Sequence, residues 1–305
     1  MRPDWDSDDE GEGGGSPPER PHASGHLLPI ISPDDDEGED PEADDELDLE
    51  VDSEPRVVLI TGASGNIGRK LRAAWEDVYD LVLIDSNPGP DEEDVIKADL
   101  SILDDEWGTH FHGVDTVVHL AANPDPESSA ADLVEPNLDA MANVFNVAAM
   151  LGVDRIIYAS SVHVMWGYRE KGDGPITPDL PPRPESPYGL FKLAGERLGQ
   201  SLADAFDLTF IAVRLGHVQA GRNRPEALSD DWHRKLWLSN HDLVQLFDAA
   251  VEAEIEDDPF VVVNGISRNH GTRWTLTNAA EVLGYLPEDD AFAPHPNVEA
   301  VDEVS

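Results

Sequence analysis

The chain has 305 residues, with 64 acidic against 20 basic side chains, and its formal net charge is −44. This charge argues against nucleic acid and anionic membranes as partners, and the lack of cysteine excludes disulfides, thiolate metal sites and a cysteine nucleophile. No apolar run is long enough to span a bilayer and no apolar leader is seen, so we expect a soluble cytoplasmic protein.

Residues 1–55 are dense in Asp, Glu, Gly, Pro and Ser, with runs such as PDDDEGEDPEADDELDLE. They hold too few apolar residues for a core, so we expect a disordered acidic extension. It is either a functional tail or a start-site artefact, and the sequence leaves both open. The rest of the chain is also acidic and poor in lysine, which favours a salt-adapted, halophilic protein over a merely acidic one.

Residues 56–288 form the expected folded domain, in which short apolar runs alternate with helical patterns. The expected strands are 57–61, 80–85, 115–122, 154–161, 208–216 and 259–267, and the expected helices include 127–151, 187–206 and 240–255. This alternation predicts an α/β fold, a Rossmann-type doubly wound parallel sheet with a small C-terminal substrate-binding region. Residues 289–305 are expected to form an acidic tail.

The first strand runs into a glycine-rich turn, TGASGNIG, with Gly62, Gly65 and Gly68 between strand and helix. Such a turn allows a dinucleotide pyrophosphate to approach the helix N-terminus. Asp85 ends the next strand, where a carboxylate accepts hydrogen bonds from ribose hydroxyls and repels a 2′-phosphate. The pattern therefore predicts NAD as the cofactor. Asp99 either lies near the adenine or caps a helix.

Three further residues suggest proton transfer beside that cofactor. Ser161 ends an expected strand, and Tyr188 and Lys192 lie one turn apart on an expected helix. A neighbouring ammonium stabilises a tyrosine phenolate, and the serine hydroxyl can hold a substrate oxygen.

These motifs, together with HLAA at 119–122 and ASS at 159–161, resemble the extended short-chain dehydrogenase/reductases, the NAD-dependent epimerase/dehydratase family. The resemblance implies that Tyr188 is the general base, that Lys192 binds the nicotinamide ribose and lowers the tyrosine pKa, and that Ser161 polarises the substrate hydroxyl. It also implies a homo-oligomer, a dimer. The cofactor-binding residues that it implies are Gly62, Ser64, Gly65, Asn66, Ile67, Gly68, Asp85, Asp99, Leu100, Leu120, Ala121, Ala122, Asn137, Tyr188 and Lys192.

Within this family the chain looks most like uronate dehydrogenases and the NAD-dependent glucose-6-phosphate dehydrogenase of halophilic archaea, through ASSxH at 159–163, VRLG at 213–216, WLS at 237–239 and NGIS at 264–267. That likeness implies oxidation of an anomeric hydroxyl to a lactone. Val162 and Trp232 depart from the uronate dehydrogenase pattern, which has Asn and a carboxylate-binding Arg at these positions. The sugar therefore stays open.

The expected substrate-binding residues are Ser161, His163, Asn123, His217 and Arg234. Residues 221–237 form either a flexible substrate loop or a salt-bridged surface patch. Ser239 is expected to cap the helix that begins at 240, with Asp242 reaching back. The histidines show no metal-ligand spacing, so no metal is expected. Two other functions stay open: an epimerase that retains NAD, and a non-catalytic nucleotide sensor.

Overall fold

Seven parallel strands form the sheet of the described part of the chain, in the order β3-β2-β1-β4-β5-β6-β7. The computed structural model describes residues 55–103, 105–170, 172, 174–228, 230–255 and 258–293. These residues all belong to one unit, Asp52–Ser305. The acidic extension expected at 1–55 lies outside them, apart from residue 55. The strands are β1 (Val57–Thr61), β2 (Asp80–Asp85), β3 (Ile96–Lys97), β4 (Thr116–His119), β5 (Arg155–Ser161), β6 (Thr209–Leu215) and β7 (Phe260–Gly265).

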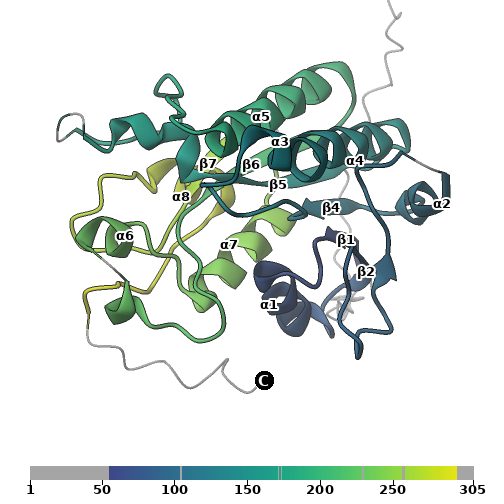
Figure 1. The fold of residues 1–305 in the computed structure, drawn as a ribbon, viewed down its shortest axis with the longest axis horizontal. Helices are drawn as coiled ribbons and strands as arrows, with labels where there is room; N and C mark the ends of the chain where they lie inside the picture. The colour runs from purple at the N-terminus through teal and green to yellow at the C-terminus, as the bar shows by residue number, and fades with distance from the viewer. Residues whose placement is uncertain are drawn as a thin grey trace, which may run out of the picture. The chain divides into compact units, whose positions relative to one another are not determined.

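Helices cover both faces of this sheet (Figure 1). The α-helices are α1 (Asn66–Trp75), α2 (Asp105–Gly108), α3 (Ala130–Leu133), α4 (Ala140–Met150), α5 (Pro187–Ala205), α6 (Asp231–Lys235), α7 (Asn240–Glu252) and α8 (Thr277–Leu283). Four other helical segments are η1 (Thr109–Phe111), the π-helical η2 (Val134–Asp139), η3 (Val162–Tyr168) and η4 (Pro225–Ala227).

Two apolar cores result, because successive residues of a strand point to opposite faces. On one face, Val58 and Ile60 of β1 join Trp75 of α1 and Phe247 of α7. On the other, Leu59 joins residues of α4 and α5. In Figure 1, α4 and α5 lie on one side of the sheet and α1 and α7 on the other. The continuous apolar strands are explained by this double cover, and the expected fold class is confirmed.

The direction in which successive strands are added to the sheet changes between β1 and β4. It runs from β1 to β2 and β3 on one side, and then returns to add β4 to β7 on the other. In an open parallel sheet, ligands bind outside the carboxyl ends of the strands at such a switch point. The turns that follow β1 and β4 therefore border the expected crevice.

The expected helix at 127–151 is wrong as a single element. The structure divides it into α3, the π-helical η2 and α4. Pro136 lies inside η2, and proline has no N–H to donate and clashes with the preceding turn. The short strand β3 was also not expected, since two residues are too few to show a period.

The ordered structure continues beyond residue 288, where a tail was expected to begin. The backbone N–H groups of Glu288 and Asp289 donate to the Asp242 carboxylate, at 2.8 and 3.1 Å. Ala291 is only 1% exposed, and its N–H donates to Asn269 Oδ1 at 2.9 Å. Residues 289–293 thus belong to the folded unit.

A third apolar cluster lies beyond the sheet, where η3 meets residues near α6 and β7. It is built on Val164, Met165, Ile176, Leu236 and Trp274. None of the helices in the described ranges is both long and apolar enough to cross a membrane.

Candidate active site

The chain turns sharply after β1, at the three glycines of the nucleotide-binding motif. Gly62 has a φ of +73°, and a Cβ there would lie 2.7 Å from the backbone N of Ala121. A Cβ on Gly68 would lie 2.3 Å from the Gly62 oxygen, so both positions need glycine. A Cβ on Gly65 would meet only the Gly62 oxygen, at 3.1 Å. The open side of Gly65 is where phosphates can approach.

Helix α1 begins directly after this turn, with Gly65 as N-cap and no side chain capping its first turn. The N–H groups of Asn66, Ile67 and Gly68 lie in that turn, at the positive end of the helix dipole. A glycine cradle that leads into an uncapped helix N-terminus fits the pyrophosphate of a dinucleotide.

Asp85 ends β2 beside the same turn. Its carboxylate accepts hydrogen bonds from the backbone N–H groups of Ser64, at 3.0 Å, and Asn87, at 2.9 Å. Each oxygen keeps a lone pair and the side chain is only partly buried, so it can also accept from ribose hydroxyls. Its fixed negative charge supports the expected preference for NAD over NADP.

Asp99 and Leu100 lie on the loop after β3. Asp99 Oδ1 accepts hydrogen bonds from the backbone N–H and the hydroxyl of Ser101, at 3.0 and 2.7 Å. It caps this turn and not an α-helix, because α2 begins only at Asp105. Leu100 is buried in the core. Contact of these two residues with the adenine stays a prediction.

The loop after β4 lies directly over the glycine turn. The N–H groups of Leu120 and Ala121 donate to the carbonyl and the hydroxyl of Thr61, at 3.1 and 3.4 Å. Thr61 Oγ1 also lies 2.8 Å from Nδ1 of His119, and burial lowers the pKa of His119 to about 3. Neutral His119 thus helps to fix the loop, in which Leu120 and Ala121 lie against the glycine turn. Contact of Leu120, Ala121 and Ala122 with the cofactor stays a prediction.

Asn137 and Asn123 bind each other. The buried Asn137 amide accepts from Asn123 N–H at 2.8 Å and donates to Asn123 O at 3.0 Å. The Asn123 side chain donates to Ser128 Oγ at 3.1 Å and accepts from Asp125 N–H at 3.0 Å. Asn137 therefore fixes the loop after β4. Direct contacts with the cofactor, for Asn137, and with the substrate, for Asn123, stay predictions.

The three expected catalytic side chains come together at the carboxyl end of β5. Ser161 is the last residue of that strand, and Tyr188 lies in the first turn of α5. Lys192 follows one turn later and is only 4% exposed. Its Nζ donates to Ala159 O at 2.7 Å and lies 5.8 Å from the centre of the Tyr188 ring.

Helix α5 reaches this position because two of its glycines face β5 and η3. A Cβ on Gly189 would lie 2.5 Å from His163 O, and one on Gly195 would lie 2.6 Å from the Tyr158 ring. Side chains at these positions would push Tyr188 away from Ser161. Sequence reasoning missed both glycines, although their spacing on the helix that carries Tyr188 was visible.

The charge state of the site differs from the one expected. Burial raises the pKa of Tyr188, and a hydrogen bond with Ser161 acts against this rise. Burial also lowers the pKa of Lys192 to about 7, so the ammonium is only partly populated at neutral pH. Lowering of the tyrosine pKa by Lys192, which the resemblance implied, stays a prediction. A cationic nicotinamide would add positive charge that favours the phenolate.

A buried ion pair lies behind the site and was also missed. Glu196 and Arg214, each 2% exposed, form two hydrogen bonds of 2.8 Å. Ser160 Oγ donates to Glu196 Oε1 at 2.6 Å, and Arg214 Nη1 donates to Pro178 O at 3.0 Å. This network ties together α5, the end of β5 and the segment before α5.

An aromatic wall, formed by His163, Trp166 and Trp232, extends from Tyr188. The His163 ring stacks on Trp166, with centroids 4.1 Å apart, and meets the Tyr188 ring edge-on at 5.5 Å. Trp232 of α6 meets Trp166 at 6.0 Å. The Arg169 guanidinium lies 5.6 and 5.7 Å from the centres of the two indole rings. Flat apolar rings beside a hydrogen-bonding imidazole suit the two faces of a pyranose.

Two of the site's histidines are neutral at physiological pH. Burial, and next the charge of His233, lower the pKa of His163 to about 4. The same two causes lower the pKa of His217, whose ring lies 6.4 Å from that of His233. Each neutral imidazole offers one donor and one acceptor, which matches sugar hydroxyl groups.

The segment 221–237, expected to be a flexible loop or a salt-bridged patch, contains η4 and α6. Trp232 brings it to the aromatic wall, and Nδ1 of His233 lies 2.8 Å from the carboxylate of Asp230, the N-cap residue of the same short helix. Arg234 contacts the C-terminal residues, and its expected contact with the substrate stays a prediction. Its guanidinium donates to Ala291 O at 2.7 Å and lies 4.3 Å from the Phe292 ring centre.

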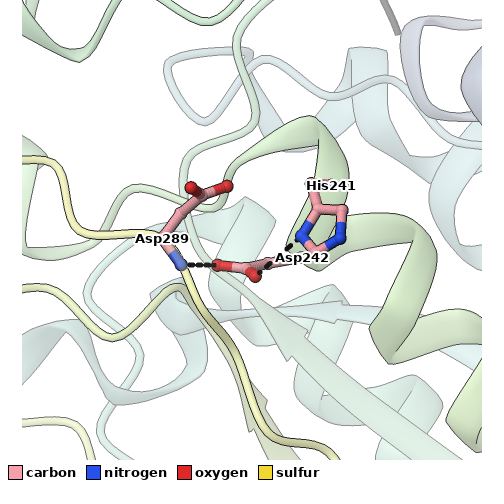
Figure 2. Close-up of side chains that lie close together, drawn as sticks. All are labelled: His241, Asp242 and Asp289. Carbon is pink, nitrogen blue, oxygen red and sulfur yellow. Dashed lines mark hydrogen bonds and ion pairs between the residues drawn. The ribbon is translucent and has the colours of Figure 1, made fainter. Parts of the chain in front are cut away.

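Among the residues that the structure describes, one cluster of possible metal ligands lies outside this site: His241, Asp242 and Asp289. The buried Asp242 carboxylate already accepts from two backbone N–H groups, and Figure 2 shows that Asp289 faces it with its N–H. Ser239 caps α7 as expected, but Asp242 does not reach back to it. Asp242 fastens the C-terminal segment, and the absence of a metal site stays a prediction.

Comparison with known proteins identifies the group to which the chain belongs. The NAD dependent epimerase/dehydratase family matches residues 58–253. The NAD-dependent glucose-6-phosphate dehydrogenase of Haloferax volcanii is 32% identical over 254 residues, 77% of this chain and 94% of that protein. The L-arabinose 1-dehydrogenase (NAD(P)(+)) of the same organism is 32% identical over 250 residues, 77% and 97%.

A crystal structure of uronate dehydrogenase from Agrobacterium tumefaciens aligns with a TM-score of 0.64 and 27% identity, over 79% of this chain and 92% of that one. The motifs, the sheet order and these relatives agree. The chain belongs to the NAD-dependent epimerase/dehydratase family.

Proposed function

We propose that this protein oxidises the anomeric hydroxyl of a sugar or sugar derivative to a lactone, with NAD⁺ as oxidant. The observation that carries the proposal is the meeting of Ser161, Tyr188 and Lys192 at the carboxyl end of β5, on the same edge of the sheet as the glycine turn after β1. The relatives named as glucose-6-phosphate, L-arabinose and uronate dehydrogenases support a sugar as the substrate.

The residues of the cradle would hold the cofactor: the turn from Gly62 to Gly68 the pyrophosphate, Asp85 a ribose, and Lys192 the nicotinamide ribose. When bound, NAD⁺ accepts a hydride from the substrate carbon. Tyr188 takes the proton of the anomeric hydroxyl on its phenolate oxygen, and Ser161 donates a hydrogen bond to the substrate oxygen. The carbon loses a hydride and its hydroxyl loses a proton, so a carbonyl forms beside the ring oxygen.

The residues after Ser161 favour oxidation over dehydration. Elimination of water from a sugar needs an acid and a base beside the reacting carbons. The described structure has the buried Val162 and the neutral His163 at these positions. His163, His217 and the two tryptophans of the aromatic wall are proposed to bind the sugar. The acidic composition also supports the proposal that the protein acts in a salt-rich cytoplasm. The homo-oligomer implied by the resemblance stays a prediction.

A panel assay tests the proposal. D-Glucuronate, D-glucose 6-phosphate and L-arabinose are each incubated with NAD⁺, and NADH and products are followed by absorbance and NMR. We expect one equivalent of NADH per sugar consumed and a lactone as the product. The methyl glycoside of an active sugar is the control, since it lacks the anomeric hydroxyl and should not react. An inverted sugar without net NADH would show an epimerase instead.

A further inference from the structure

The C-terminal residues 285–292, here called the C-terminal strap, lie across the loop after β7. Tyr285 is fully buried and its hydroxyl donates to Ile266 O at 3.0 Å. The buried Asp242 carboxylate holds the next part through the two backbone N–H groups already described. Asn269 accepts from Ala291 N–H at 2.9 Å. The strap is thus held along its length by buried acceptors.

Arg234 connects this strap to α6. The arginine is the fourth residue of that five-residue helix, and its guanidinium bonds Ala291 O and covers the Phe292 ring. Asn269, which holds Ala291 from the other side, also donates to the carbonyls of Lys235 and Trp237 at 3.2 and 2.7 Å. The residues at the end of α6 are therefore fastened to the strap by two separate side chains.

Helix α6 carries two residues that lie near the proposed sugar-binding residues. Trp232 forms the far part of the aromatic wall, and the charge of His233 helps to keep His163 neutral. A helix of five residues has too few internal hydrogen bonds to hold its own place. Its position must come from what it is fastened to.

We propose that Arg234 is a positioning residue, which couples the C-terminal strap to α6 and so holds Trp232 and His233 against the sugar. This inference rests on the proposed function, because it concerns how that sugar is bound. The sequence-based prediction that Arg234 binds the substrate itself is the alternative to this inference.

The rival interpretation is a direct contact between Arg234 and an anionic substituent of the sugar. Arg234 Nε is buried and has no hydrogen-bond partner among the described residues, so one donor is free in principle. The two interpretations differ in substrate dependence. A direct ion pair affects only anionic sugars, whereas a displaced wall affects charged and neutral sugars alike.

Two variants test the coupling from opposite sides in the full-length protein. Arg234→Met removes the guanidinium, and Phe292→Ala removes the ring beneath it, which lies on the strap and not on α6. Arg268→Met is the control: it removes an exposed arginine that donates to Glu288 O at 3.4 Å, on the same strap but away from α6. KM and kcat are measured for glucuronate, glucose 6-phosphate and L-arabinose, together with KM for NAD⁺.

Amide hydrogen exchange of residues 231–237 is the second measurement, and it needs no substrate. Arg234→Met should raise the KM of every sugar that the wild type oxidises by roughly fivefold, as expected for losing one hydrogen bond and one cation–π contact. Phe292→Ala loses only the cation–π contact and should raise the same KM values by roughly threefold. KM for NAD⁺ should change less than about twofold, and exchange over 231–237 should rise by about tenfold, with α5 unchanged. Arg268→Met should resemble the wild type.

Every other outcome contradicts either the inference about Arg234 or the proposed function. If Arg234→Met weakens only the anionic sugars and Phe292→Ala changes nothing, the direct contact is right and the inference is overturned. Unchanged exchange over 231–237 in both variants also overturns it. If the wild type oxidises no sugar, the proposed function fails, and the exchange data alone decide whether the strap positions α6.

Discussion

Replacing Lys192 with methionine should stabilise the ligand-free protein at neutral pH while it abolishes turnover. Burial lowers the pKa of Lys192 from its ordinary 10.5 to about 7. One pH unit corresponds to ~1.36 kcal/mol, so carrying this amine into the core costs the fold about 4–5 kcal/mol at and below pH 7. The variant loses the bond to Ala159 O, which costs about 1–3 kcal/mol. We therefore expect a net gain of about 1–4 kcal/mol.

The pH dependence distinguishes the cost of burying the Lys192 amine from an effect of the substitution on packing. Between pH 7 and 10.5 the unfolded chain binds more protons at Lys192 than the folded protein does. Wild-type stability therefore rises with pH through this window, relative to a variant without the amine. The advantage of Lys192→Met should shrink towards pH 10 and vanish or reverse there.

Thermal unfolding of both proteins at pH 7 and pH 10 measures this effect, without cofactor and at one fixed salt concentration. A gain of about 1–4 kcal/mol corresponds to a melting temperature higher by roughly 3–12 °C at pH 7. Lys97→Met on β3 is the control, because it removes an exposed amine by the same substitution. A Lys192→Met variant that is less stable at pH 7, or whose difference from wild type is the same at both pH values, would refute the reasoning.

Three further results are expected. Asp85→Ser should lower the preference for NAD⁺ over NADP⁺ in kcat/KM by at least about tenfold, and a wild type that uses both equally would contradict the cofactor assignment. Glu196→Ala should lower the free energy of unfolding, measured by calorimetry, by about 3–5 kcal/mol, since it leaves the buried Arg214 without its carboxylate. By the same measurement, loss of the exposed ion pair between Arg56 and Glu252 should cost less than about 1 kcal/mol. The melting temperature should rise up to about 2 M KCl as salt screens the acidic surface, and a flat or falling curve would count against salt adaptation.

The parts of the fold that depend on local pattern could be predicted from the sequence. The glycine spacing predicted the turn after β1, and the carboxyl end of β2 was predicted at Asp85, because close backbone approach and sheet burial leave a visible pattern. Strands β1 and β2 begin and end where the apolar runs do. Ser161 and Tyr188 could be paired because the position of each depends on one strand end and one helix start.

What could not be predicted depends on contacts between distant segments. The π-helical turn at Pro136 breaks a pattern that reads as one helix, although the proline itself was a sign of the break. The burial of Asp242 by residues 288 and 289 has no local signature, so the folded unit was expected to end too early. Arg234 was expected to bind the substrate, and the contacts of its guanidinium with Ala291 and Phe292, far along the chain, have no local signature either.

The electrostatic state of the site was equally hidden. A Tyr-x-x-x-Lys spacing suggests a cation beside a phenolate, but the spacing does not show how much water each group loses. In the fold both side chains are largely buried, so burial raises one pKa and lowers the other. Proton transfer is therefore expected to depend on cofactor binding.

The most direct test of the proposed reaction is Tyr188→Phe, assayed with the best sugar of the panel. The substitution keeps the ring that packs against His163 and removes only the ionisable oxygen. We predict that NAD⁺ binds with unchanged affinity while kcat for lactone formation falls by at least ~10²-fold, as expected for the loss of a general base. Turnover close to that of the wild type would contradict the account, since the proton would then leave by another route.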